Sequence, residues 1–426
     1  MEQFSGERDY LEVLTRRAVL PRGFRVSVTR ISFTPKERPT EEPYAMNLAL
    51  LLSDNPTDSF AGVFTRNQFP GAPVILGRER MAGEKLQGII VNNKIANVCS
   101  QTGVEDARTL TDRAAALTGS EGSHWLSVST GIIGWSLPVA EMSAALEPLV
   151  DGLHSGDALD VARAIMTTDS FPKVRSRSVG EGRVLGIAKG AGMIEPNMAT
   201  MLVFLLTDID VDREDAQRIL QDAAEHSFNR ISVDSDQSTS DMAVLLSSRH
   251  VQAPSLDQFA AAVNDVCREL ASDIVRNGEG TSHVMRVAVS GLPDERTAVG
   301  AGKAIVNSPL VKTAIFGNDP NVGRLVSALG DFTGNNNVKI DRSRVAVYLG
   351  NESVFRDGAF HLDKEKEVRL SEYLKMTAMN PRLHGYPQHD RFVDIKIDCG
   401  TGSGSALVLG SDLSHEYVRE NADYRT

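Results

Sequence analysis

The sequence lacks the features that mark several large classes of protein. Its three cysteines, Cys99, Cys267 and Cys399, are too few and too widely spaced for a disulfide framework or a Cys-x-x-Cys metal site. The longest apolar run, 201–206, falls far short of the roughly 20 residues that span a bilayer. Lysine and arginine number 45 against 56 aspartate and glutamate residues, so the chain has a net charge of −11 and no basic surface for nucleic acid. We therefore expect a protein of the reducing cytoplasm with neither a membrane nor a nucleic-acid partner.

Metal and phosphate motifs are missing as well. His384 and His389 flank a segment that contains a proline, and no His-Glu-x-x-His motif occurs, so no metal site is predicted. The glycine-rich stretch 400–404 lacks the lysine of a phosphate-binding loop and leads into an apolar run instead of a helix. We interpret this stretch as a hairpin turn.

Short β-rich runs alternate with segments of helical periodicity. Hydrophobic residues make up 41% of the 426-residue chain and charged residues 24%, as in an ordinary globular protein. Strands are predicted at 88–92, 201–206, 243–246, 285–290, 345–349, 392–398 and 406–409. Helices are predicted at about 155–166, from Asp212 to His226, and from an N-cap at Ser255 to Asn277. The pattern predicts an α/β or α+β protein in which helices cover sheets.

The run 201–206 and the segment before it combine unusual features. The run does not alternate, so we expect a strand buried on both faces, inside a layered sandwich. Before it come Lys189, two turn glycines, a Pro-Asn turn and Thr200. Taken alone, these residues favour a connecting loop with a hydrogen-bonded threonine. The alternative is a threonine whose hydroxyl attacks the preceding peptide bond, which would free an α-amine to act as the general base of that same hydroxyl.

With these features the sequence resembles the ornithine acetyltransferase family, the bifunctional glutamate N-acetyltransferases of arginine biosynthesis. The stretch Lys-Gly-x-Gly-Met-Ile-x-Pro-Asn-Met-Ala-Thr, residues 189–200, is the most specific landmark. The other landmarks lie at 62–67, 129–134, 165–173, 227–234, 275–280, 311–321 and 416–426. The resemblance therefore covers most of the chain.

The resemblance implies a self-cleaved enzyme. The cut would fall between Ala199 and Thr200, giving an α chain, 1–199, and a β chain, 200–426, with a C-terminal portion from about 290. Thr200 would take the acetyl group of N2-acetyl-L-ornithine as an ester and pass it to L-glutamate. Thr130 and Gly131 match the oxyanion hole. The positions that match substrate-binding residues are Thr167, Lys189, Thr200, Glu279, Asn421 and Thr426.

These roles are chemically reasonable for the residue types. Lys189 offers a cation to a substrate carboxylate, and Glu279 offers a carboxylate to an amino group. Lys189 would also lower the pKa of the new α-amine of Thr200 by like-charge repulsion. The family further implies an α-β-β-α sandwich, an α2β2 heterotetramer, and chemistry that needs no metal or organic cofactor. Acetyl-CoA serves part of the family as a second donor, and its use here stays open.

Four stretches depart from the family pattern, and one of them is extra sequence near the N-terminus, around Pro35 to Pro43. Asn93, Lys94 and Ile95 replace Ser-Gly-Asn of the family, and the stretch from Ser235 to Met242 differs at several polar positions. Val322 replaces a tryptophan, which we interpret as the loss of an aromatic wall of the site. Three alternatives therefore stay open. They are a divergent paralogue that acts on another N-acyl amino acid in secondary metabolism, an N-terminal-threonine amidohydrolase or aminopeptidase, and a non-catalytic scaffold.

Overall fold

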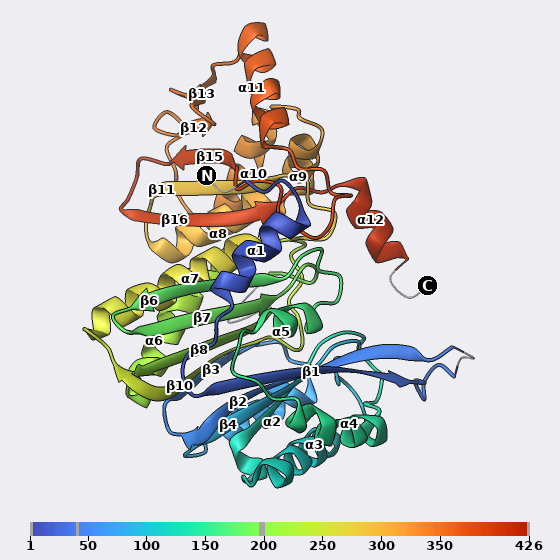
Figure 1. Cartoon of the computed structure of the whole chain (residues 1–426). Helices are drawn as coiled ribbons and strands as arrows, with labels where there is room; N and C mark the ends of the chain where they lie inside the picture. Colours follow the sequence, from blue (N-terminus) through green and yellow to red (C-terminus); the bar gives the residue numbers. More distant parts are fainter. Residues whose placement is uncertain (1–2, 40–41, 196–200, 424–426) are drawn as a thin grey trace.

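The computed structural model describes residues 3–39, 42–195 and 201–423, and its strands form three sheets (Figure 1). The first sheet has the order β1 (Phe24–Phe33), β2 (Tyr44–Thr57), β4 (Leu86–Asn92), β5 (Trp125–Ser129). The second has the order β3 (Phe60–Phe64), β10 (Met242–Gln252), β8 (Leu202–Asp210), β7 (Gly182–Lys189), β6 (Lys173–Val179). The third has the order β14 (Ala359–Phe360), β13 (Glu352–Arg356), β12 (Ala346–Leu349), β15 (Val393–Asp398), β11 (Val284–Leu292), β16 (Gly404–Ser411), β9 (Ile231–Ser232).

The first two sheets stack face to face and are covered by helices outside. Side chains such as Leu51 of β2 and Phe204 of β8 share one core between the sheets. On the outer face of the first sheet lie α3 (Gly103–Thr118) and α4 (Val139–Asp151), and on that of the second lie α6 (Arg213–Glu225) and α7 (Leu256–Arg276). This arrangement confirms the predicted α-β-β-α sandwich (Figure 1). The smaller elements beside it are α1 (Glu7–Arg17), α2 (Ala72–Met81), α5 (Leu159–Ala164), η1 (Gly122–His124) and η2 (Phe228–Arg230).

The central strand β8 lies between β7 and β10 and pairs with both. Its alternate side chains enter different cores, with Leu205 facing α6 and α7 and Phe204 facing the first sheet. The strand is therefore buried on both faces, as its non-alternating sequence predicts. Leu202, at its start, pairs with Lys189 of β7 and with Met242 of β10. This register brings three chain segments together at one end of the sheet.

The third sheet has its own hydrophobic core. Side chains of β11, β12, β15 and β16 pack with α8 (Glu295–Asn307), α9 (Pro309–Phe316), α10 (Val322–Asn335) and α11 (Lys364–Thr377). The last helix, α12 (His415–Ala422), projects from this part of the molecule and carries the C-terminal end (Figure 1).

The predicted elements agree with the structure except in the length of one helix and in one connection. All seven predicted strands and the helices α6 and α7 are present, and the Ser255 hydroxyl accepts a hydrogen bond from Gln258 N at 3.2 Å as the predicted N-cap. The predicted helix at 155–166 is shorter. The stretch 400–404 is not a hairpin turn, because β15 and β16 pair with opposite edges of β11. Within the described residues, no helix has the length and apolar character needed to cross a membrane.

Candidate active site

A cavity of about 250 Å³ opens at the start of β8, and it gathers the predicted site residues from five segments. Its lining includes Thr130, Gly131, Thr167, Lys189, Glu279 and Asn421. The remaining wall comes from Ala96, Ile132, Ile133, Thr168, Gly192, Met193, Ser238, Thr239 and Ser240. Ala199, Thr200 and Thr426 lie outside the described residues. Met201, which directly follows Thr200, accepts a hydrogen bond from Met242 N at 3.0 Å.

The loop after β5 carries two possible hydrogen-bond donors to the cavity, the Gly131 N–H and the Thr130 hydroxyl, and two main-chain hydrogen bonds hold this loop in place. Thr130 N donates to Asn92 O at 3.1 Å, and Ile132 N donates to Lys94 O at 2.9 Å. These bonds anchor the loop on both sides of Gly131, whose φ of +132° is open to glycine and costly for other residues. In the described part of the chain, the Gly131 N–H and the Thr130 hydroxyl make no hydrogen bond. Both residues line the cavity, so these two donors are candidates for binding a substrate oxygen.

The altered stretch at 93–95 supports this loop. The Asn93 side chain accepts from Asn47 N at 2.8 Å and donates to Ala164 O and Met166 O at 3.1 and 3.0 Å. Lys94 takes a left-handed φ of 71°, so it occupies the place of the family's glycine in a conformation that glycine favours. Its side chain is exposed, while its main chain lies against Gly131. The main chain at the replaced glycine position therefore anchors the loop, since Lys94 O accepts the hydrogen bond from Ile132 N.

Opposite charges line the cavity on different elements. Lys189 is the last residue of β7, and Glu279 follows the C-terminal end of α7. Glu279 is only 8% exposed and accepts a hydrogen bond from Asn421 Nδ2 at 2.8 Å, which brings α12 to the site. A Cβ at Gly192 would lie 2.4 Å from the Glu279 carboxylate, so the absence of a side chain at this position leaves room for that carboxylate. The wall thus offers a cation for a carboxylate and an anion for an amine.

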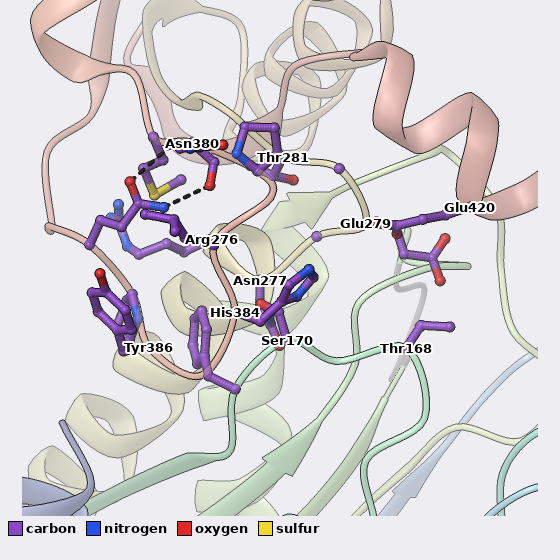
Figure 2. A pocket seen from close by; sticks show the side chains of 18 residues that line it. Thr168, Ser170, Arg276, Asn277, Glu279, Thr281, Asn380, His384, Tyr386 and Glu420 are labelled. Atoms are coloured by element: carbon purple, nitrogen blue, oxygen red, sulfur yellow. Dashed lines mark hydrogen bonds between the residues drawn. The ribbon is translucent and has the colours of Figure 1, made fainter. Parts of the chain in front are cut away.

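A second, smaller cavity of about 30 Å³ lies behind Glu279 (Figure 2). It shares Thr168 and Glu279 with the larger one, and Glu420 of α12 lies beside Glu279. A space of this size holds on the order of one or two water molecules. It gives the Glu279 side of the site a polar back wall.

Two buried carboxylates near the cavity were not predicted. Burial raises the pKa of Asp241 well above its usual range, although a hydrogen bond with Ser238 and the charge of Lys189 oppose the shift. Its Oδ2 has no hydrogen-bond partner among the described residues. Burial also acts to raise the pKa of Asp169, but the charges of Lys173 and Lys189 outweigh it and lower that pKa to about 2. The signal in the sequence that could have indicated Asp241 is its position directly before the buried strand β10.

One predicted site position is wrong. Val322 begins α10 and is buried in the core of the third sheet, with Leu325 and Leu329 of the same helix. It does not belong to the cavity lining in the described residues. The replaced tryptophan is therefore not a wall of this site, because the position is part of a separate hydrophobic core. By contrast, 238–240 of the altered stretch before β10 do line the cavity.

The fold and the cavity define an α-β-β-α sandwich protein with a polar site at the start of its central strand, lined by side chains of opposite charge. The chain belongs to the ArgJ family, which matches residues 37–426 and confirms the resemblance found in the sequence. It is 38% identical over 416 residues to the arginine biosynthesis bifunctional protein ArgJ of Nitratidesulfovibrio vulgaris, covering 95% of this chain and 99% of that protein. The ArgJ protein of Geobacter sulfurreducens is 36% identical over 413 residues, covering 94% and 100%. The solved ArgJ structure from Bacillus halodurans is 30% identical with a TM-score of 0.46, covering 52% of this chain and 98% of that chain.

Proposed function

We propose that this chain is a self-processing acetyltransferase that moves the acetyl group of N2-acetyl-L-ornithine to L-glutamate through an ester on Thr200. The observation that carries the proposal is the convergence of Thr130, Gly131, Thr167, Lys189, Glu279 and Asn421 on one cavity where β8 begins. Membership in the ArgJ family supports the same enzyme class.

Each group has a role in a two-step transfer. The Thr200 hydroxyl attacks the acetyl carbon, and the α-amine of Thr200 takes the hydroxyl proton. The negative oxygen of the tetrahedral intermediate receives hydrogen bonds from the Gly131 N–H and the Thr130 hydroxyl. The intermediate collapses, the α-amine returns the proton to the leaving nitrogen, and ornithine departs. The neutral amine of glutamate then attacks the ester carbon, and the α-amine of Thr200 takes a proton from the attacking nitrogen. The ester C–O bond breaks, the α-amine returns this proton to the Thr200 oxygen, and N-acetylglutamate departs.

Binding uses the charges of the cavity wall. Lys189 holds the α-carboxylate that both substrates carry, and Thr167 contributes polar contact beside it. Glu279, buried and oriented by Asn421, pairs with the side-chain ammonium of ornithine. The proposal extends to chains of residues 1–199 and 200–426, assembled as an α2β2 heterotetramer in the cytoplasm.

Intact mass measurement of the purified protein beside Thr200→Ala tests the first step. We expect two fragments that divide between Ala199 and Thr200 in the natural sequence, and one uncut chain in the variant. An uncut natural chain would remove the proposed general base and contradict the mechanism.

Acetyl transfer measured against release of free acetate tests the second step. We expect acetylglutamate to form in excess, and dominant acetate release would make the protein a hydrolase. Val322 does not open this cavity to water, because it is buried in the core of the third sheet. A panel of N-acetyl amino acids separates arginine biosynthesis from a divergent role, because Ser238, Thr239 and Ser240 line the cavity at altered positions.

A further inference from the structure

A buried ion pair lies directly behind the cavity. Asp169 Oδ1 is 2.6 Å from Lys173 Nζ, and both side chains are 0% exposed. Neither residue lines the cavity. Buried ion pairs contribute little net stability compared with well-packed apolar residues, so this pair calls for an explanation other than stability.

Both oxygens of Asp169 hold main-chain groups of the site. Oδ2 accepts from Thr167 N at 3.1 Å, and Oδ1 accepts from Gly190 N at 2.8 Å in addition to Lys173. Thr167 lines the cavity, and Gly190 directly follows Lys189. One carboxylate therefore fixes two substrate-binding segments relative to each other.

Lys173 extends the contact to a third segment. Its Nζ donates to Asn277 Oδ1, and Asn277 Nδ2 in turn donates to Ser170 Oγ. Asn277 caps the C-terminal end of α7, two residues before Glu279. Figure 2 shows Asn277 beside Ser170, with Glu279 further along the same chain segment. The network thus reaches the segments that carry Thr167, Lys189 and Glu279.

The charge of Asp169 is shared unequally between two lysines. Lys173 is in direct contact with it, while Lys189 acts on it through space. As long as Lys173 neutralises Asp169, the Lys189 ammonium can turn to a substrate. Without Lys173, the buried carboxylate would still feel the charge of Lys189 and would compete with the substrate for it.

We propose that Asp169, Lys173 and Asn277 are positioning residues, and that Lys173 neutralises Asp169 so that Lys189 stays available to the substrate carboxylate. The inference rests on the proposed acetyl transfer and deepens it. It makes a specific prediction about charge. A variant that leaves Asp169 unpaired should weaken the binding only of those substrates whose carboxylate contacts Lys189.

The test compares Lys173→Met with the double variant Asp169→Asn/Lys173→Met in the full-length, cleaved protein. Methionine keeps the length of the buried side chain, and the double variant has no uncompensated buried charge. The substrates are N-acetylornithine and its carboxamide, which lacks the α-carboxylate. We expect Lys173→Met to raise KM for N-acetylornithine at least tenfold and KM for the carboxamide less than twofold, with the smaller effect on kcat. The KM of the double variant for N-acetylornithine should be at least threefold lower than that of Lys173→Met.

Equal increases in KM for both substrates, or no recovery in the double variant, would overturn the proposal in favour of a merely structural role. Should Lys173→Met fail to fold or to cleave, the double variant decides alone. It supports the proposal if the ratio of the carboxamide KM to the N-acetylornithine KM stays within threefold of that of the natural protein, and any lower ratio overturns it.

The natural protein is assayed first, so that the two proposals fail separately. A natural protein that does not transfer acetyl groups refutes the proposed function. In that case, calorimetry measures the binding of ornithine and its carboxamide to the same variants and tests the network. The ratios of the dissociation constants then replace the ratios of KM as criteria.

Discussion

Gly131 is the position where the structure predicts the sharpest loss of activity for the smallest change. Gly131→Ala adds one methyl group, which would lie 2.2 Å from the carbonyl carbon of Lys94 and 2.3 Å from its oxygen. Ordinary contacts of a Cβ begin at 3.4 Å, so relief needs a main-chain movement of about 1 Å (3.4 − 2.2). The φ of +132° adds strain of roughly 1–3 kcal/mol.

Under the proposed mechanism, a movement of that size removes the Gly131 N–H from hydrogen-bonding distance of the oxyanion. The loss of one such donor costs about 3 kcal/mol of barrier, which is on the order of 100-fold in rate. We therefore expect kcat for acetyl transfer to fall about 100-fold in Gly131→Ala, with a smaller change in KM. Cleavage before Thr200 is measured in parallel, since only the cleaved fraction enters kcat.

Gly134→Ala is the matched control in the same loop. Gly134 also has a positive φ, +89°, but an added Cβ would have no neighbour within 4 Å. It should show the strain of the backbone without the collision, and kcat should stay within about threefold. A Gly131→Ala enzyme as active as Gly134→Ala, at a similar melting temperature, would refute the assignment of Gly131 to the oxyanion hole.

Three further predictions follow from buried groups of the site. Gly192→Ala would push the Glu279 carboxylate out of place, because the added Cβ would lie 2.4 Å from it, and KM for N-acetylornithine should rise about tenfold in steady-state kinetics with little change in kcat. Asp169 has a folded-state pKa of about 2 against an ordinary 3.8, so its contribution, on the order of 2 kcal/mol, is present above pH 4 and lost as the pH falls toward 2. Melting curves from pH 5 to pH 2.5 should therefore fall more steeply for the natural protein than for Asp169→Asn/Lys173→Met, and parallel curves would contradict this. Asp241 has a raised pKa, so the folded state retains a proton that the unfolded chain loses, and stability falls as the pH rises above about 4. As the pH rises over this range, the melting temperature of Asp241→Asn should increase relative to that of the natural protein. A difference in melting temperature that stays constant with pH would show that Asp241 is already ionised.

The sandwich could be predicted because its signals are local. The run 201–206 has the apolar, non-alternating sequence of a strand buried on both faces, and β8 is such a strand. Ser255 and Asn277 mark the ends of α7 because caps are chosen by the adjacent backbone. The connection 400–404 was mispredicted because strand order is decided by partners elsewhere, here β11 between β15 and β16. No residue within the stretch carries that information.

The site was predictable only through the specific motif and its family resemblance. The landmarks named Thr130, Lys189 and Glu279, and the structure brings these residues to one cavity. The Asp169–Lys173 pair was missed, because a lysine four residues after an aspartate is typical of an exposed helical pair. Its burial follows from tertiary contacts with Gly190 and Asn277, which are about 20 and 100 residues away. Val322 was wrongly assigned to the site, because the sequence does not show that this position is buried in the core of the third sheet.

The proposed cleavage does not coincide with a structural boundary, and this determines what happens to the two chains. The second sheet has the order β3-β10-β8-β7-β6, so β8 and β10 of residues 200–426 lie between β3 and β7 of residues 1–199. The pairing of β7 with β8 runs from Lys189 opposite Leu202 to Val184 opposite Thr207, and both strands contribute to the core between the sheets. Cutting one peptide bond before β8 removes none of these contacts. The fragments should therefore elute together in native size-exclusion chromatography and separate only in denaturant. Separation under native conditions would mean that the cut lies elsewhere or that the strand pairing is wrong.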